Sequence, residues 1–288
     1  SVVIENGRIA EVLTNWKPLS APCEEVIDAT GCYLLPGIID DHVHFRDPGL
    51  THKADILTES RAAAAGGVTS IMDMPNTNPL TVTLDALNAK LDLLNEKCIV
   101  NHSCYFGATN NNYTEFDKLD KHRVCGIKLF MGSSTGNMLV DKMNSLLNIF
   151  NGTDMLIAAH CEDQETIKNN IEKYKQKYKG ADDIPVSAHP SIRSVPACYA
   201  SSELAVRLAK IAGARLHILH VSTAKELQLF SDEPLANKNI TAEACVAHLL
   251  FTLTHYNSLG ARIKCNPAVK RKTDREALRT AVNSGLID

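Results

Sequence analysis

The stretch that decides the fold reads Leu34-Leu-Pro-Gly-Ile-Ile-Asp-Asp-His-Val-His-Phe-Arg-Asp-Pro-Gly49. Its first six residues are apolar apart from a Pro-Gly break, and this pattern predicts a buried strand of a barrel. His42 and His44 follow two positions apart, so on a strand both imidazoles point to the same face. Two imidazoles on one face at a strand end can bind a divalent metal ion. We prefer this interpretation to a plain polar turn, because Asp-His-Val-His followed by Arg-Asp-Pro-Gly is an unusual sequence for a strand end.

The composition predicts a globular protein. The chain has 288 residues, of which 44% are apolar, enough for one large domain or two small ones with a sizeable core. A net charge of -3 and a pI near 6.4 give no basic surface for nucleic acid. The sequence contains no run of eighteen or more apolar residues, so we expect no membrane span. Nine cysteines without a Cys-x-x-Cys pair favour free thiols in a reducing cytoplasm.

The first 33 residues differ from the rest. Val2 to Ile4, the pair Asn6-Gly7 and Ile9 to Leu13 predict a β-hairpin. We expect residues 1–33 to be the N-terminal part of a small β-sandwich and residues 34–288 to form the main domain.

Apolar strand-like segments alternate with helical segments from Leu34 onward, which predicts a parallel sheet. The seven strand candidates are residues 34–39, 68–72, 99–106, 126–130, 155–160, 215–221 and 240–244. The best fit is a (β/α)8 barrel, because candidate metal ligands lie at the C-terminal ends of several different strands. A doubly wound sheet is the alternative, but it usually carries a glycine-rich phosphate loop, and the sequence has none. An eighth strand is expected to begin at residues 286–288, where the sequence stops.

Helix signals separate these strands. Thr83 is placed to cap one helix, and Pro196 opens another that Gly213 closes. Thr273 and Glu276 have the spacing of a capping box at the start of the last helix.

Lys128 lies within the apolar run Gly126-Ile-Lys-Leu-Phe130. A charged lysine is costly to bury, so the simplest interpretation is a side chain that reaches solvent beyond the strand end. Beside a metal site, a lysine of lowered pKa can instead react with carbon dioxide. The resulting carbamate is an anionic oxygen ligand that can bridge two metals.

Three more histidines lie near predicted strand ends. His160 ends the run 155–160, where a core or capping role is the alternative to a catalytic one. His217 and His220 are three apart, so on one strand they face opposite sides. We expect His220, nearer the strand end, to face the barrel axis and His217 to pack on the outer face, although a role behind the ligands stays open. His248 could line the site.

Basic residues cluster at Lys270-Arg271-Lys272. We interpret them as a solvated loop, with attraction of an anionic substrate as the alternative.

Several of these segments carry a family resemblance. They are His42-Val-His-Phe-Arg-Asp-Pro-Gly-Leu50, Ala62-Ala-Ala-Ala-Gly-Gly-Val-Thr69 and Asp73-Met-Pro-Asn-Thr-Asn-Pro79, together with Gly-Ile-Lys-Leu-Phe, His-Cys-Glu-Asp and His-Val-Ser-Thr. Together they resemble the dihydroorotases, a branch of the amidohydrolase superfamily close to the hydantoinases and allantoinases. The resemblance runs through nearly the whole chain, and the choice of dihydroorotase rests mainly on Phe-Arg-Asp-Pro-Gly and Met-Pro-Asn-Thr.

The resemblance implies a binuclear zinc site at the mouth of the barrel. His42, His44 and a carbamylated Lys128 would hold one zinc, and the same lysine with His160 and His220 would hold the other. Some family members use one metal, or bridge two with an aspartate. The implied substrate-binding residues are Arg46, Asn76 and Asn266.

The implied reaction is the reversible cyclisation of N-carbamoyl-L-aspartate to L-dihydroorotate in pyrimidine biosynthesis. The implied partners are this small-molecule substrate and further copies of the chain, in a homodimer or other homo-oligomer. Two alternatives stay open: a hydantoinase, dihydropyrimidinase or allantoinase acting on a neutral ring, and a non-catalytic scaffold or fragment.

One family feature has no counterpart in this sequence. The family carries an aspartate at the end of its eighth strand, which acts as general acid and base, and this chain ends at Asp288. We therefore expect an incomplete barrel whose general acid and base lies beyond Asp288, and a piece that is catalytically poor by itself.

Overall fold

The structure is a computed structural model that describes residues 1–14, 23–132, 138–180, 182 and 184–288. Contacts between residues divide the chain into two units, Ser1–Pro36 and Gly37–Asp288. The division lies close to the predicted boundary between residues 33 and 34.

The first unit contains the predicted hairpin. Strands β1 (Val2–Glu5) and β2 (Arg8–Val12) pair antiparallel. Asn6 and Gly7 between them have φ of 51° and 72°. This pair of left-handed residues matches the right-handed twist of the two strands, which is why Asn-Gly forms tight hairpins.

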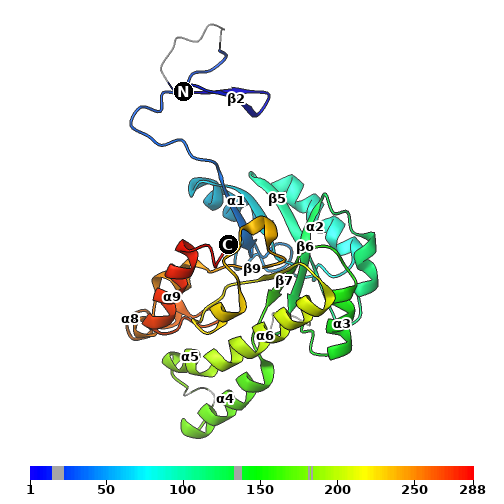
Figure 1. Cartoon of the computed structure of the whole chain (residues 1–288), viewed down its shortest axis with the longest axis vertical. Coiled ribbons are helices and arrows are strands. Elements are labelled where there is room, and N and C mark those ends of the chain that lie inside the picture. The colour runs from blue at the N-terminus through cyan, green and yellow to red at the C-terminus, as the bar shows by residue number, and fades with distance from the viewer. Residues whose placement is uncertain (15–22, 133–137, 181, 183) are drawn as a thin grey trace. The chain divides into compact units, whose positions relative to one another are not determined.

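The second unit is built on a parallel sheet of seven strands in the order β3-β4-β5-β6-β7-β8-β9 (Figure 1). The strands are β3 (Ile38–Val43), β4 (Val68–Asp73), β5 (Asn101–Gly107), β6 (Val124–Phe130), β7 (Ile157–His160), β8 (Leu216–Ile218) and β9 (Ile240–Ala242). Each strand pairs with the next in sequence, whereas a doubly wound sheet reverses its strand order at a switch point. The sheet also curls, because His42 on β3 contacts Glu243 directly after β9. The fold is therefore an incomplete (β/α)8 barrel, as predicted.

Strand β3 corrects one expectation. The buried strand predicted over residues 34–39 begins only at Ile38, beyond Pro36 and Gly37. Leu34 and Leu35 are exposed, and Ile38 and Ile39 are more than half exposed. Proline has no backbone N–H to donate to a neighbouring strand, so sheet pairing starts after the Pro-Gly break.

Helices connect the strands and cover the outside of the curled sheet (Figure 1). The α-helices are α1 (Ile56–Ala65), α2 (Leu84–Lys97), α3 (Met143–Asn151), α4 (Gln164–Lys177), α5 (His189–Ile192), α6 (Val195–Ala212), α7 (Val246–Leu250), α8 (Tyr256–Leu259) and α9 (Lys272–Asn283). The 3-10 helices are η1 (Tyr113–Lys118), η2 (Val186–Ala188), η3 (Glu226–Leu229), η4 (Leu235–Asn237), η5 (Leu253–His255) and η6 (Gly260–Ile263). None of the helices in the described part of the chain is long and apolar enough to cross a bilayer.

Helix caps follow the sequence signals with one exception. Thr83 accepts a hydrogen bond from the Ala86 backbone N at 3.2 Å, and Gly213 ends α6 with φ of 66°. Helix α9, however, begins at Lys272, with the Asp274 carboxylate accepting from the Arg271 backbone N at 3.2 Å. The capping box predicted at Thr273 and Glu276 is therefore wrong by two residues.

Different clusters of buried side chains pack against the two faces of the sheet. Phe106, Ile127 and Ile157 belong to the main core between sheet and helices, where each fully buried side chain contributes about 2 kcal/mol. Tyr105 and Ala158 belong to a small separate cluster on the inner face. Because neighbours along a strand alternate between faces, this division shows which polar residues point into the barrel.

Candidate active site

His42 lies on strand β3 and His44 directly follows it, with their imidazoles on one face, as predicted. Their ring centroids lie 5.3 Å apart. The Nδ1 atom of His42 lies 2.5 Å from Glu243 Oε1, and that of His44 lies 2.9 Å from Asn76 Oδ1. Both acceptors are oxygens, so both Nδ1 atoms donate, and each ring keeps Nε2 for another partner.

His160 and His220 complete a cluster of four imidazoles. His160 Nδ1 lies 2.9 Å from His220 Nε2, and the rings meet edge to face at 4.7 Å between centroids. His220 in turn lies 5.3 Å from His42 between ring centroids. The structure therefore brings together the four histidines that the sequence selected from strands β3 and β7 and the turn after β8.

Lys128 lies on β6 and is 1% exposed, so the solvent-reaching alternative is wrong. Its Nζ lies 4.5 Å from the centre of the Phe130 ring. Burial lowers the pKa of Lys128 to about 7. The lysine is also close enough to His44, His160 and His220 to depress the pKa of each ring.

Three histidines of the cluster, His44, His160 and His220, have lowered pKa values that favour the uncharged imidazole. Burial is the first cause that lowers the pKa of His44, His160 and His220. Neighbouring imidazoles add to it for His44 and His220, because two cations repel at short range. Neutral imidazole is the form that binds a metal ion.

This donor set suits a divalent metal such as zinc. Two nitrogens on one tetrahedral zinc are about 3.3 Å apart, given bonds of about 2.0 Å. The 2.9 Å between His160 Nδ1 and His220 Nε2 is close to that separation. Two sets of three possible ligand atoms lie within 4.8 Å of one another among the described residues: His42, Glu243 and Cys245, and Asp41, His217 and Glu243. Both His42 Nδ1 with Glu243 Oε1 at 2.5 Å and His160 Nδ1 with His220 Nε2 at 2.9 Å are at hydrogen-bond distance.

His217 corrects a prediction. It faces the barrel interior, because it pairs in register with Ala158 of the inner-face cluster. Its Nε2 lies 3.3 Å from Glu243 Oε2 and 3.7 Å from Asp41 Oδ2. Both His217 and His220 reach the interior because β8 ends at Ile218 and His220 has φ of 42°, so strand alternation stops between them.

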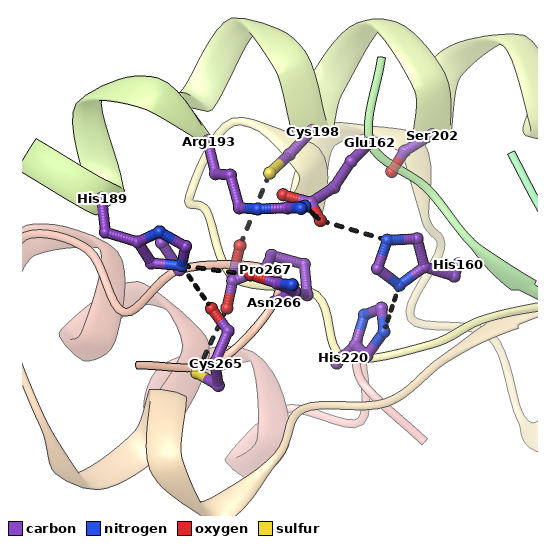
Figure 2. A network of polar contacts seen from close by, with 12 residues as sticks. His160, Glu162, His189, Arg193, Cys198, Ser202, His220, Cys265, Asn266 and Pro267 are labelled. Atoms are coloured by element: carbon purple, nitrogen blue, oxygen red, sulfur yellow. Dashed lines mark hydrogen bonds and ion pairs between the residues drawn. The ribbon is translucent and has the colours of Figure 1, made fainter. Parts of the chain in front are cut away.

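Glu162 anchors the far side of the cluster and was not singled out from sequence. It is fully buried, and Figure 2 shows its carboxylate between Arg193 and His160. Glu162 Oε2 pairs with Arg193 Nη1 and lies 3.1 Å from His160 Nε2. Burial opposes ionisation, but His160, Arg193 and Lys270 hold the pKa of Glu162 below its usual value. Its sequence signal was its place two residues after His160 at a strand end.

Arg46 lies beside the histidine cluster, and one of its hydrogen-bond donors has no partner among the described residues. Its Nη1 is buried and has no hydrogen-bond partner among the described residues. Its backbone has φ of 65°, a conformation uncommon for a residue with a side chain and often found at functional sites. Arg46 is also close enough to His44 to lower the pKa of that ring. A buried, unpaired guanidinium nitrogen can donate to a carboxylate.

The two predicted asparagines differ in their surroundings. Asn76 is buried and orients His44 through its Oδ1. Asn266 Oδ1 lies 3.1 Å from His189 Nε2, next to a cis peptide bond at Pro267 (Figure 2). His248 supports the same segment, since its Nε2 lies 2.9 Å from Pro267 O.

Lys270 is buried, which corrects the solvated-loop interpretation for this residue, whereas Arg271 and Lys272 are exposed as expected. Its Nζ donates to Ser222 Oγ and Ala268 O, both at 3.1 Å, and lies 3.5 Å from Cys198 Sγ. A lysine enclosed in this way cannot attract substrate from solution, although its charge stabilises the nearby Glu162 carboxylate.

The loops after β3 and β4 lock together and set the position of Arg46. Asp73 Oδ1 accepts from the Phe45 backbone N at 3.0 Å, and its Oδ2 lies 2.8 Å from the buried Lys90 Nζ. The Asn78 backbone N donates to Pro48 O at 3.0 Å. A Cβ added to Gly49 would lie 1.9 Å from Asn78 O, so only glycine permits this contact.

Comparisons with known proteins agree with this geometry. Residues 31–226 match the family model described as dihydro-orotase-like. A dihydroorotase of Methanosphaera stadtmanae is 31% identical over 277 residues, covering 94% of this chain and 61% of that protein. An allantoinase of Deinococcus radiodurans is 29% identical over 294 residues, covering 99% of this chain and 63% of that protein.

The fold also resembles that of solved structures. The L-hydantoinase (dihydropyrimidinase) of Arthrobacter aurescens superposes with a TM-score of 0.91 at 27% identity. That match covers 100% of this chain and 63% of the hydantoinase. The chain thus spans less than two thirds of the length of these relatives.

Proposed function

Because the chain belongs to the dihydroorotase-like family of the amidohydrolase superfamily, we propose that it forms most of the active site of a zinc-dependent dihydroorotase. The proposed reaction is the reversible cyclisation of N-carbamoyl-L-aspartate to L-dihydroorotate in pyrimidine biosynthesis. The observation that carries the proposal is the cluster of four imidazoles around the buried Lys128, with Arg46 Nη1 beside it and without a hydrogen-bond partner among the described residues.

The proposed ligands of two zinc ions are His42, His44, Lys128, His160 and His220. Bound zinc would polarise the substrate carbonyl and lower the pKa of a bound water. Lys128 is proposed to bridge the two ions as a carbamate. A pKa of about 7 supports this, since only the uncharged amine reacts with carbon dioxide.

The proposed substrate contacts have separate roles. Arg46 would bind the substrate carboxylate through its planar guanidinium and so orient the ring over the metal cluster. Asn76 would contact the substrate while keeping His44 in place, and Asn266 would contact it from the opposite wall. The general acid and base is proposed to come from a residue beyond Asp288. The cytoplasmic location and the homo-oligomeric state stay predictions.

Arg46→Met tests the substrate assignment. In the whole protein we expect KM for carbamoyl-aspartate to rise about 100-fold, because losing a charge-assisted hydrogen bond costs about 1.5 to 3 kcal/mol. The matched control is Arg61→Met on the exposed face of α1, which should leave KM unchanged. Zinc content should be the same in both variants.

A neutral cyclic amide such as a hydantoin is the second candidate substrate, favoured by the likeness to the L-hydantoinase. Such a ring carries no carboxylate for Arg46 to bind. Full activity on hydantoin with none on dihydroorotate, unaffected by Arg46→Met, would replace the first proposal with this one.

A further inference from the structure

Glu243 contacts three histidines, and its contact with His42 connects the two edge strands of the sheet, β3 and β9. Its Oε1 lies 2.5 Å from His42 Nδ1 and accepts from the His220 backbone N at 3.0 Å. Its Oε2 lies 3.3 Å from His217 Nε2. One carboxylate directly after β9 therefore contacts β3 and both histidines of the β8 region.

The chemistry of a carboxylate fixes the state of its partners. An ionised glutamate can only accept hydrogen bonds, so the imidazole nitrogen that faces it must carry the proton. His42 is then protonated on Nδ1 and presents the lone pair of Nε2, which is the state a metal ligand needs. The contact with the His220 backbone N holds the residue whose φ is 42°.

We propose that Glu243 is a positioning residue that prepares His42 and His220 together for metal binding. This rests on the proposed zinc site, in which these two histidines belong to different ions. Glu243 sets the protonated nitrogen of His42 and the backbone of His220, so its loss disturbs both ions. His217 is the third donor to Glu243 and keeps its second oxygen in place.

Glu243→Gln is the sharpest test, because the side chain keeps its size but has one accepting oxygen in place of two. The amide NH2 would face an imidazole N–H or the His220 N–H, and two donors cannot hydrogen bond. We expect zinc affinity, measured by competition with a chelator in the whole protein, to fall 10- to 100-fold, as for other residues that orient metal ligands.

Glu226→Gln is the matched control. Glu226 is buried and, like Glu243, accepts two side-chain hydrogen bonds, from Ser202 at 2.7 Å and Thr223 at 2.8 Å. It contacts none of the proposed ligands within the described residues. Its zinc affinity should match that of the unmodified protein.

A second measurement needs no metal, and its first part uses the unmodified protein alone. Nitrogen-15 NMR of the zinc-free, unmodified protein should show His42 protonated on Nδ1, and Glu243→Gln should shift that proton toward Nε2. An Nε2-protonated His42 in the unmodified protein, or equal zinc affinity in Glu243→Gln, overturns the proposal for Glu243. If the unmodified protein binds no zinc, the proposed function fails, while the NMR result still decides whether Glu243 sets the state of His42.

Discussion

Arg193 and Glu162 form a largely buried ion pair beside His160. Glu162 is fully buried, and the Arg193 side chain is 12% exposed. A buried charge is tolerated when its partner stays in place, and removing one partner leaves the other charge unpaired in a poorly polarisable interior. Because Glu162 also contacts His160, this pair links protein stability to the proposed metal site.

We expect Arg193→Met to destabilise the protein by about 3 kcal/mol, measured by urea unfolding of the zinc-free form. Adding Glu162→Gln to Arg193→Met should restore part of that loss, because the amide carries no charge. Additive effects of the two substitutions would show that the pair is not coupled and contradict this account.

At the residue scale, spacing predicted directions only where the backbone is extended. His42 and His44 lie on or next to β3, and the two-residue alternation of side chains along a strand correctly predicted that they share a face. The same rule failed for His217, because β8 ends at Ile218 and the backbone turns at His220. The burial of Lys270 was also predicted wrongly, because a run of basic residues does not show that its first member is buried.

At the element scale, the loops after β3 and β4 act as one unit. Gly49 packs against the Asn78 backbone, and Asp73 at the end of β4 holds Phe45. Arg46 lies within this pair of loops, so its direction depends on contacts between the two loops.

Gly49→Ala tests this interlocking, with Gly67→Ala as the matched control. Both glycines have positive φ, 79° and 82°, but a Cβ at Gly67 meets nothing within 4 Å. We expect Gly67→Ala to cost about 1 kcal/mol from backbone strain alone. Gly49→Ala should cost about 2 kcal/mol more from overlap with Asn78 and raise KM for carbamoyl-aspartate. Equal unfolding free energies for the two variants would refute the interlock.

Periodicity and capping residues predicted which segments are helices and which are strands. The exact ends of these elements depended on individual residues and their hydrogen bonds. The Thr83 cap and the Gly213 stop were visible in sequence, because one side chain or one backbone conformation decides each. The start of β3 and the cap of α9 were not visible in sequence. Pro36 has no backbone N–H for sheet pairing, and Asp274 accepts from the Arg271 backbone N, and spacing alone identifies neither effect.

At the scale of the molecule, the consecutive strand order gathers chemistry from β3, β6, β7 and β8 at one end of the sheet. Alternating strands and helices predicted this topology, since parallel strands with helical crossovers close in one direction. The role of Glu243 could not be predicted in the same way. It lies 201 residues from His42, and only the curl of the sheet brings the two together.

Metal removal should therefore weaken the whole molecule. Zinc bound at the proposed cluster would stabilise the folded state by about 4 kcal/mol when free zinc exceeds its Kd 1,000-fold. We expect the Tm of the whole protein to fall when a chelator strips the metal, and to recover with zinc but not with calcium. Superimposable melting curves before and after stripping would argue against a metal in this cluster.

The proposed metal site is a single cation cluster among His42, His44, Lys128, His160 and His220. Anomalous diffraction at the zinc edge, from crystals of the whole protein, would locate the ions themselves. We expect two zinc peaks within bonding distance of these side chains, bridged by density on Lys128 Nζ. No zinc peak, or a single peak among Asp41, His217 and Glu243, would contradict it.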